Sequence, residues 1–218
     1  MKDLLNYLRN PVYCLNTKPK FTYFLRLYLY LILIEIPINL GILFITKEFH
    51  IKQSEVVGWS ARQVMFLTIL FSPVYEEILF RSLLKFKKIN ILLFIVTNLF
   101  LWLFAFFRSK MSSPVFYMLP ILVFGLLSLL LWFGRDKIEQ YISSNFKYFF
   151  YGTVLIFGSL HASNFTGNMY LILAFSPILG GPQIVGGLLL GYIRMKNGLV
   201  YSVLFHVLLN SVFLFHFL

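Results

Sequence analysis

The chain has 218 residues, of which 59% are hydrophobic and only 12% are charged. A soluble domain carries about 25% charged residues, so this composition indicates a protein built for lipid. The formal net charge of +11 would suit a nucleic-acid partner. The basic residues lie between apolar segments, however, and that pattern is typical of membrane topology and of contact with anionic lipids. We therefore expect membrane lipids as partners and no nucleic acid.

Residues 1–20 precede the first long apolar run. They lack the basic start, apolar core and small-residue cleavage site of a signal peptide, so we expect a short cytoplasmic lead. Its apolar side chains are expected to lie on the membrane surface; they are Leu4, Leu5, Tyr7 and Leu8. The single cysteine, Cys14, excludes an internal disulfide and a cysteine-based metal cluster. With no internal repeat and no low-complexity linker, residues 1–218 are expected to form one membrane-embedded domain.

A membrane-spanning helix needs about 20 consecutive apolar residues, and the chain contains apolar segments that approach this length. They predict an all-α fold, a polytopic transmembrane helix bundle with about seven spanning segments. The stretches between them, including the mixed-charge stretch 134–147, are interpreted as connections. The predicted spans cover residues 22–45, 62–84, 90–107, 115–133, 147–162, 169–193 and 198–217.

Lysine and arginine are concentrated in every second connection. Cytoplasmic loops of membrane proteins carry an excess of these residues, so the pattern predicts a cytoplasmic N-terminus and an outer C-terminus. The inner connections hold Lys2, Arg9, Lys18, Lys20, Arg81, Lys85, Lys87, Lys88, Arg135, Lys137, Lys147, Arg194 and Lys196, whereas the outer ones hold Lys47, Lys52, Arg62, Arg108 and Lys110.

The sixth predicted span is rich in glycine. Small residues allow two helices to approach closely in a membrane, so we interpret these glycines as helix-packing positions. The alternative is a kink that opens a groove in the bundle. The residues concerned are Gly180, Gly181, Pro182, Gly186, Gly187 and Gly191.

Two adjacent carboxylates and an arginine lie inside the second predicted span, at Glu76, Glu77 and Arg81. Charged groups at membrane depth cost several kcal/mol each and usually have a function. Neighbouring residues on a helix point about 100° apart, so we do not expect Glu76 and Glu77 to serve one site. Glu77 and Arg81 are four residues apart and can neutralise each other. Glu76 is left without a partner in its own helix, so we expect its partners on other helices.

Two further polar pairs occupy apolar segments at the same four-residue spacing: Phe157 with His161, and His206 with Asn210. A rise of about 1.5 Å per residue places Glu76 and His206 at similar depths and His161 somewhat deeper. The three can therefore meet in one chamber that opens toward the cytoplasm. A single buried histidine is more often a packing or helix–helix hydrogen-bonding residue. The occurrence of three such elements in separate segments favours a functional site.

The chemistry available to these side chains is hydrolytic. A carboxylate helped by a histidine can take a proton from water, and a second histidine with an amide N–H can hydrogen-bond an oxyanion. Alternatively, Glu76, His161 and His206 form a three-ligand set for catalytic zinc with water as the fourth ligand. The chain lacks the His-Glu-x-x-His run of the common zinc proteases. The residues leave the zinc mechanism and the metal-free mechanism equally open.

In chain order, the runs Glu-Glu-x-x-x-Arg at 76–81, Phe-x-x-x-His at 157–161 and His-x-x-x-Asn at 206–210 resemble the signature of the CPBP family. These are the CAAX-prenyl-endopeptidase and bacteriocin-processing intramembrane proteases, also called the Abi family. The resemblance covers roughly Ser72 to Ser211, and the motif core is expected within about residues 62–217.

The resemblance implies an intramembrane endopeptidase, a hydrolase of the bacterial cytoplasmic membrane that cleaves a peptide or a lipidated protein. It implies that Glu76 and His161 activate water and that His206 and Asn210 stabilise the oxyanion or complete the site. Glu77, Arg81 and Phe157 would support the motif. The family is often labelled metalloprotease, while a metal-free glutamate mechanism fits the same residues.

The short loops offer little surface for a large substrate. A member that processes a peptide, or that serves bacteriocin immunity or envelope regulation, therefore suits the sequence better than one that cleaves large prenylated proteins. Two rival interpretations stay open. The first is a catalytically silent membrane scaffold or immunity protein. The second is a small transporter that uses Glu76 and the histidines as a proton relay, although transporters of this kind are built from repeats.

Overall fold

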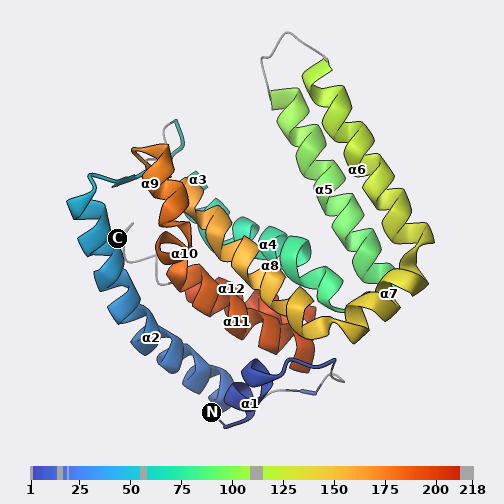
Figure 1. Cartoon of the computed structure of the whole chain (residues 1–218), viewed down its shortest axis with the longest axis horizontal. Helices are drawn as coiled ribbons and strands as arrows, with labels where there is room; N and C mark the ends of the chain where they lie inside the picture. The colour runs from blue at the N-terminus through green and yellow to red at the C-terminus, as the bar shows by residue number, and fades with distance from the viewer. Residues whose placement is uncertain (1, 14–16, 19, 55–57, 109–114, 212–218) are drawn as a thin grey trace.

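A computed structural model describes residues 2–13, 17–18, 20–54, 58–108 and 115–211, with side chains described outside residues 104–123. The described chain is predominantly α-helical, as the sequence predicts (Figure 1). Within it, two helical stretches, Phe21–Glu48 and Ala61–Leu84, are long and apolar enough to cross a membrane. Shorter apolar helical stretches cover Lys88–Leu103, Phe124–Phe133 and Leu199–Asn210. The arrangement of seven spans stays a prediction.

The first half of the chain follows the predicted segments closely. The second predicted span is a continuous helical stretch in which the π-helix η1 interrupts regular α-helix. Helix α5 and helix α6 form a hairpin that projects from the rest of the molecule (Figure 1). The elements are α1 Lys2–Arg9, α2 Phe21–Glu48, α3 Ala61–Phe66, η1 Leu67–Phe71, α4 Ser72–Arg81, the 3₁₀ turn η2 Ser82–Leu84, α5 Lys88–Arg108 and α6 Val115–Phe133.

The second half departs from the predicted segments in two places. The mixed-charge stretch expected to be a connection contains a helix, α7, and the predicted span 169–193 is divided into three helices. Residues 212–217 of the last predicted span lie outside the described residues. The elements are α7 Arg135–Ser144, α8 Phe146–Leu160, η3 His161–Asn164, α9 Met169–Ala174, α10 Ser176–Leu179, α11 Gly181–Lys196 and α12 Leu199–Asn210.

The division of the sixth span has a local cause. The side chain of Asn168 caps the start of α9 by accepting hydrogen bonds from the backbone N–H groups of Tyr170 and Leu171. Pro177 and Pro182 occupy the first turns of α10 and α11. Proline has no N–H and is tolerated in the first turn, where no intrahelical bond is lost, so each proline starts a new helix.

The main hydrophobic core lies where α8 and α11 pack together, with α12 against both α11 and α4. Leu4 and Tyr7 are buried in this core, and the expectation that they lie on the membrane surface is wrong. The apolar face of α1 instead packs against protein, where Tyr7 lies edge-on to the rings of Phe150 and Tyr192.

A second, smaller hydrophobic cluster contains Ile42, Ile51, Ala162 and Leu179. Beside it, the strand β1 Lys52–Gln53 pairs antiparallel with the strand β2 Phe165–Thr166. This short pairing joins the loop after α2 to the segment that follows His161. It therefore restrains the backbone on one side of that histidine.

Glycines bring α8 and the α10–α11 junction into backbone contact. A Cβ atom placed on Gly180 would lie 1.9 Å from the carbonyl oxygen of Gly158, and one placed on Gly158 would lie 2.2 Å from the side chain of Ile184. A Cβ on Gly191 would lie 2.6 Å from the ring of Phe150. The interpretation of these glycines as packing positions is confirmed at Gly180 and Gly191.

We expect Gly180→Ala to lower the free energy of unfolding by about 1–3 kcal/mol or more, because the added methyl group meets backbone that cannot move aside. Gly186→Ala is the matched control, since a Cβ there meets nothing within 4 Å. Alanine is also the better residue in a helix interior. Thermal unfolding of the two variants in detergent checks the prediction, and equal unfolding temperatures would contradict it.

Candidate active site

The structure brings together three of the residues that the sequence singles out. The Oε2 atom of Glu76, on α4, lies 3.7 Å from Nε2 of His206 on α12. The same oxygen lies 3.9 Å from Nε2 of His161, the first residue of η3. The Glu76 side chain keeps 16% of its surface exposed and that of His161 keeps 21%, whereas His206 keeps 7%. One carboxylate oxygen therefore faces two imidazole nitrogens in a partly accessible position.

The orientation of His161 is fixed by the last turn of the preceding helix, α8. Its Nδ1 atom lies 2.8 Å from the carbonyl oxygen of Phe157, one turn earlier. A carbonyl oxygen can only accept a hydrogen bond, so Nδ1 carries the proton and Nε2 of the neutral ring presents a lone pair. The Phe157 ring packs edge-on against the imidazole at 4.7 Å between centroids. Phe157 thus holds His161 through both its backbone and its side chain.

The orientation of His206 is fixed by the second carboxylate. Its Nδ1 atom lies 3.0 Å from Oε1 of Glu77, which is fully buried. A carboxylate is an acceptor, so Nδ1–H donates and Nε2 is left facing Glu76. The expectation that Glu76 and Glu77 would not serve one site is therefore wrong. The two nitrogens of an imidazole lie on different sides of the ring, so one ring can contact carboxylates that diverge on a helix.

Glu77 and Arg81 form the predicted pair four residues apart, at 3.4 Å with 0% and 2% of their side chains exposed. The guanidinium carbon also lies 3.8 Å from the centre of the Phe157 ring. A Cβ on Gly187 would lie 3.2 Å from both Arg81 and Phe157, so glycine at this position leaves room for the stacked pair. Glu77 accepts one more hydrogen bond, from the hydroxyl of Ser202 on α12.

Glu76 has a partner in its own helix, contrary to expectation. The hydroxyl of Ser72, one turn earlier on α4, donates a hydrogen bond to Oε1 of Glu76. This bond leaves Oε2 of the same carboxylate to face the two histidines. The four-residue spacing between Ser72 and Glu76 was the signal that the sequence offered for this contact.

Asn210 contacts the backbone rather than the histidines. Its side-chain N–H donates a hydrogen bond of 2.8 Å to the carbonyl oxygen of Thr68, which belongs to the π-helix η1. Single-turn π-helices are frequent at functional sites and alter the pattern of backbone hydrogen bonding. Asn210 therefore anchors α12 to η1, and its amide retains a second N–H.

Three polar side chains thus follow one another on successive turns of α12: Ser202, His206 and Asn210. Each bonds to the helical stretch that contains Glu76. Sequence reasoning found the last two and missed Ser202, although it precedes His206 by the same four residues. It also missed the buried Arg194, whose Nε donates to the carbonyl oxygen of Arg81 at 2.9 Å. Arg194 caps the end of α4, where helical carbonyls lack partners.

The donor set suits zinc by its chemistry. Among the described residues, however, no group of three or more histidine, cysteine, aspartate or glutamate side chains is arranged to hold a metal ion. In this arrangement the three residues do not fit a zinc site. Separations of 3.7 and 3.9 Å exceed a direct hydrogen bond, so Glu76 and the two rings lie close together without bonding directly.

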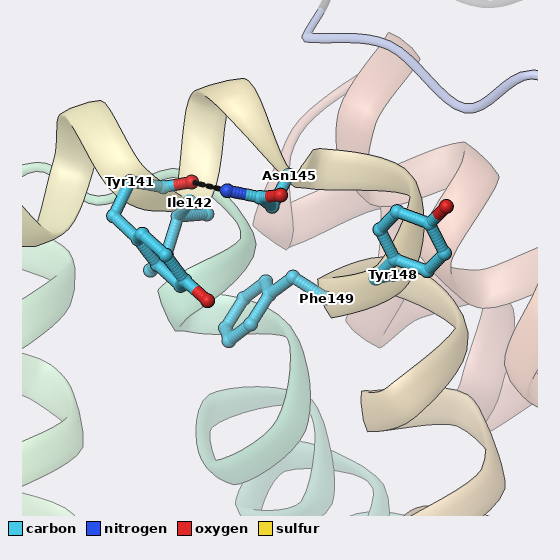
Figure 2. A pocket seen from close by; sticks show the side chains of 5 residues that line it. All are labelled: Tyr141, Ile142, Asn145, Tyr148 and Phe149. Atoms are coloured by element: carbon cyan, nitrogen blue, oxygen red, sulfur yellow. Dashed lines mark hydrogen bonds between the residues drawn. The ribbon is translucent and has the colours of Figure 1, made fainter.

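A surface hollow lies elsewhere, where α7 meets α8, and Figure 2 shows its lining. The side-chain N–H of Asn145 donates to the carbonyl oxygen of Tyr141 across one turn, at 3.1 Å. Its described lining residues include no carboxylate and no histidine, and none of them belongs to the site around Glu76. The lining residues are Tyr141, Ile142, Asn145, Tyr148 and Phe149.

Comparison of the chain with models of known protein families, with curated proteins and with solved structures found no match. The functional argument therefore rests on the geometry of these side chains and on the order of the three motifs.

Proposed function

We propose that the protein is an intramembrane endopeptidase that hydrolyses a peptide bond in a membrane-associated peptide or protein. One observation carries the proposal. A single carboxylate oxygen of Glu76 faces Nε2 of His161 and of His206, and the Nδ1 atom of each ring has its own hydrogen-bond acceptor. A carboxylate with two oriented acceptor nitrogens beside it can position one water molecule and take a proton from it.

In the proposed reaction, a water molecule between these groups attacks the carbonyl carbon of the peptide. A C–O bond forms while a proton passes from the water to Glu76, assisted by the Nε2 lone pair of His161. The C–N bond then breaks, and the proton is delivered to the leaving nitrogen. The products are a new carboxyl group and a new amine, so the step needs no other reactant than water.

The oxyanion formed in this reaction needs hydrogen-bond donors, and the family resemblance assigns them to His206 and Asn210. Asn210 has one amide N–H left for this purpose after its bond to Thr68. His206 can donate from Nε2 only after that atom has taken a proton, because Glu77 holds the ring with its proton on Nδ1. We therefore infer that the proton taken by Glu76 passes to Nε2 of His206, which then donates to the oxyanion until that proton is delivered to the leaving nitrogen.

The proposal includes seven membrane spans, a cytoplasmic N-terminus and a site that is reached from the cytoplasmic side of a bacterial membrane. In support, α1, α7 and the end of α11, which carry many of the basic residues of the predicted inner connections, lie toward the same end of the molecule (Figure 1). The loop after α2 and the strand β2 lie toward the other end. The short loops favour a small peptide or the tail of a lipidated protein as substrate.

The test is cleavage of a quenched fluorescent peptide with a lipidated C-terminus by the purified protein in liposomes, with and without a chelator. We expect cleavage to persist in the chelator and to fall about 10²- to 10⁴-fold in His161→Asn, because general acid–base assistance is lost. His50→Asn is the matched control, since His50 is exposed in the loop after α2. Stoichiometric zinc with activity lost to the chelator would contradict the metal-free mechanism. Equal activity of both variants would contradict the site.

A further inference from the structure

The Glu77 carboxylate lies at the centre of a buried network that extends away from the proposed site. It is fully buried and is contacted by Arg81, by the hydroxyl of Ser202 and by Nδ1–H of His206. Ser202 is itself fully buried. Of these three partners, only His206 also contacts Glu76. Ser202 thus acts on the proposed site through Glu77, whereas Arg81 also contacts the Phe157 ring that packs on His161.

We propose that Ser202 is a positioning residue whose hydroxyl holds the Glu77 carboxylate in the rotation that accepts Nδ1–H of His206, and so keeps Nε2 of that ring unprotonated toward Glu76. The catalytic meaning of this role rests on the proposed function. The state of the ring is a property of the resting protein and can be measured without a substrate.

The contacts of Ser202 indicate why a single hydroxyl can matter. Ser202 has one hydrogen to donate and lies within reach of two acceptors, Oε2 of Glu77 and the carbonyl oxygen of Leu190 at 3.1 Å. A hydrogen bond to an ionised acceptor is roughly twice as strong as one to a neutral acceptor, so the carboxylate takes the proton. The hydroxyl, which belongs to α12, thereby holds Oε2 of Glu77 in place. Oε1 of the same carboxylate is left to accept the hydrogen bond from His206.

Arg81 offers the Glu77 carboxylate a second orientation, which competes with the one that Ser202 holds. Its two terminal nitrogens, Nη1 and Nη2, are buried and have no hydrogen-bond partner among the described residues, although Nη1 lies 3.4 Å from Oε1 of Glu77. Guanidinium and carboxylate groups favour two parallel hydrogen bonds. Without Ser202, Glu77 would leave one oxygen unpaired in the protein interior, which is unfavourable. A rotation of the Glu77 carboxylate toward Arg81 gives the unpaired oxygen a partner and moves Oε1 away from Nδ1–H of His206.

The orientation of the Glu77 carboxylate decides which nitrogen of the His206 ring carries the proton. Which nitrogen carries the proton is set by the hydrogen bond of the other nitrogen. With Oε1 in place, the proton stays on Nδ1, and Nε2 accepts. With Oε1 withdrawn, the proton can move to Nε2, which then donates toward Glu76 and can no longer take over the proton that Glu76 accepts from water.

The experiment is solid-state ¹⁵N NMR of the full chain in liposomes, with labelled histidine and with the His206 signals assigned from their absence in His206→Asn. We expect a protonated Nδ1 and a bare Nε2 in the unsubstituted protein. In Ser202→Ala we expect a large share of the form protonated on Nε2. We also expect kcat for the quenched peptide to fall about tenfold, the rate equivalent of one lost hydrogen bond, with little change in KM, because the hydroxyl acts on the ring rather than on the substrate.

Two further variants separate positioning from general packing. Ser211→Ala, at the end of the same helix, removes a hydroxyl that donates to the backbone of Leu208 and is expected to leave the His206 ring unchanged. Ser202→Cys keeps a weaker donor, so its ring state is expected to lie between those of serine and alanine. It also provides a second test if Ser202→Ala folds poorly.

An Nε2-protonated ring in the unsubstituted protein would overturn the proposal. So would an unchanged ring in Ser202→Ala, or a larger change in Ser202→Cys than in Ser202→Ala. If the ring responds as expected but the unsubstituted protein hydrolyses no peptide, the positioning contact stands and the peptidase assignment fails.

Discussion

Glu76→Gln is expected to reduce peptide hydrolysis by about 10²- to 10⁴-fold, because general acid–base catalysis contributes a factor of this size. Glutamine keeps the volume of the side chain and can still accept the hydrogen bond from Ser72. It has no basic oxygen to take a proton from water between His161 and His206. The measurement is the rate of cleavage of the quenched peptide in liposomes, per unit of folded protein.

The control for Glu76→Gln is Glu48→Gln, which makes the same chemical change at an exposed position at the end of α2. We expect normal activity from Glu48→Gln and normal membrane insertion from both variants. The thermal unfolding temperature of Glu76→Gln should stay close to that of the unsubstituted protein. Full hydrolytic activity in Glu76→Gln would exclude this residue as the base.

Glu77→Gln is expected to lower the free energy of unfolding by about 3–5 kcal/mol, the usual effect of removing one partner of a buried ion pair. Arg81 would stay charged and buried, with the Phe157 ring as its neighbour but no carboxylate beside it. The folded yield should fall at least as much as the activity of the folded fraction. The measurement is unfolding by denaturant in detergent micelles.

Two comparisons test whether burial of the charge is the cause. Asp136→Asn removes one partner of the exposed Arg135–Asp136 pair and should change the free energy of unfolding by less than about 1 kcal/mol. The double variant Glu77→Gln, Arg81→Met removes both charges and should recover part of the stability lost in the single variants. Strictly additive single effects would show that the pair does not interact.

The helices of the first half of the chain could be predicted because each depends on a local signal. Long apolar runs mark the cores of α2, α5 and α6, and polar or basic stretches mark the ends of several of them. The pairing of Glu77 with Arg81 was predictable because a four-residue spacing fixes a shared helix face. The approach of Glu76, His161 and His206 was suggested by similar depth and by the family resemblance, since counting residues along a helix does not show which faces meet.

Other features depend on contacts between distant segments and have no local signal. Arg194 lies in an apolar helix, and only the packing of α11 against the end of α4 gives its guanidinium the carbonyl oxygens of Arg81 and Ser82. The π-helix η1 has no composition that separates it from its neighbours. Helix α7 lacks the long apolar run that marks a span, so its mixed charge predicts a connection rather than a helix.

Two errors came from reading one helix at a time. The divergence of Glu76 and Glu77 on α4 predicts separate environments, but one imidazole on another helix contacts both carboxylates. The contribution of Ser202 was missed because a serine in an apolar helix is usually a packing residue. Both contacts involve α12, so they follow from the position of that helix against α4 rather than from either sequence segment alone.

The most direct test of the central claim is hydrolysis in H₂¹⁸O. The protein in liposomes would be supplied with a library of membrane-anchored peptides, and the products would be read by mass spectrometry. We expect the unsubstituted protein to generate new C-terminal carboxyl groups that carry ¹⁸O, and Glu76→Gln to generate none above the level of empty liposomes. New C-termini produced equally by both proteins, or by neither, would contradict a water-activating site at Glu76, His161 and His206.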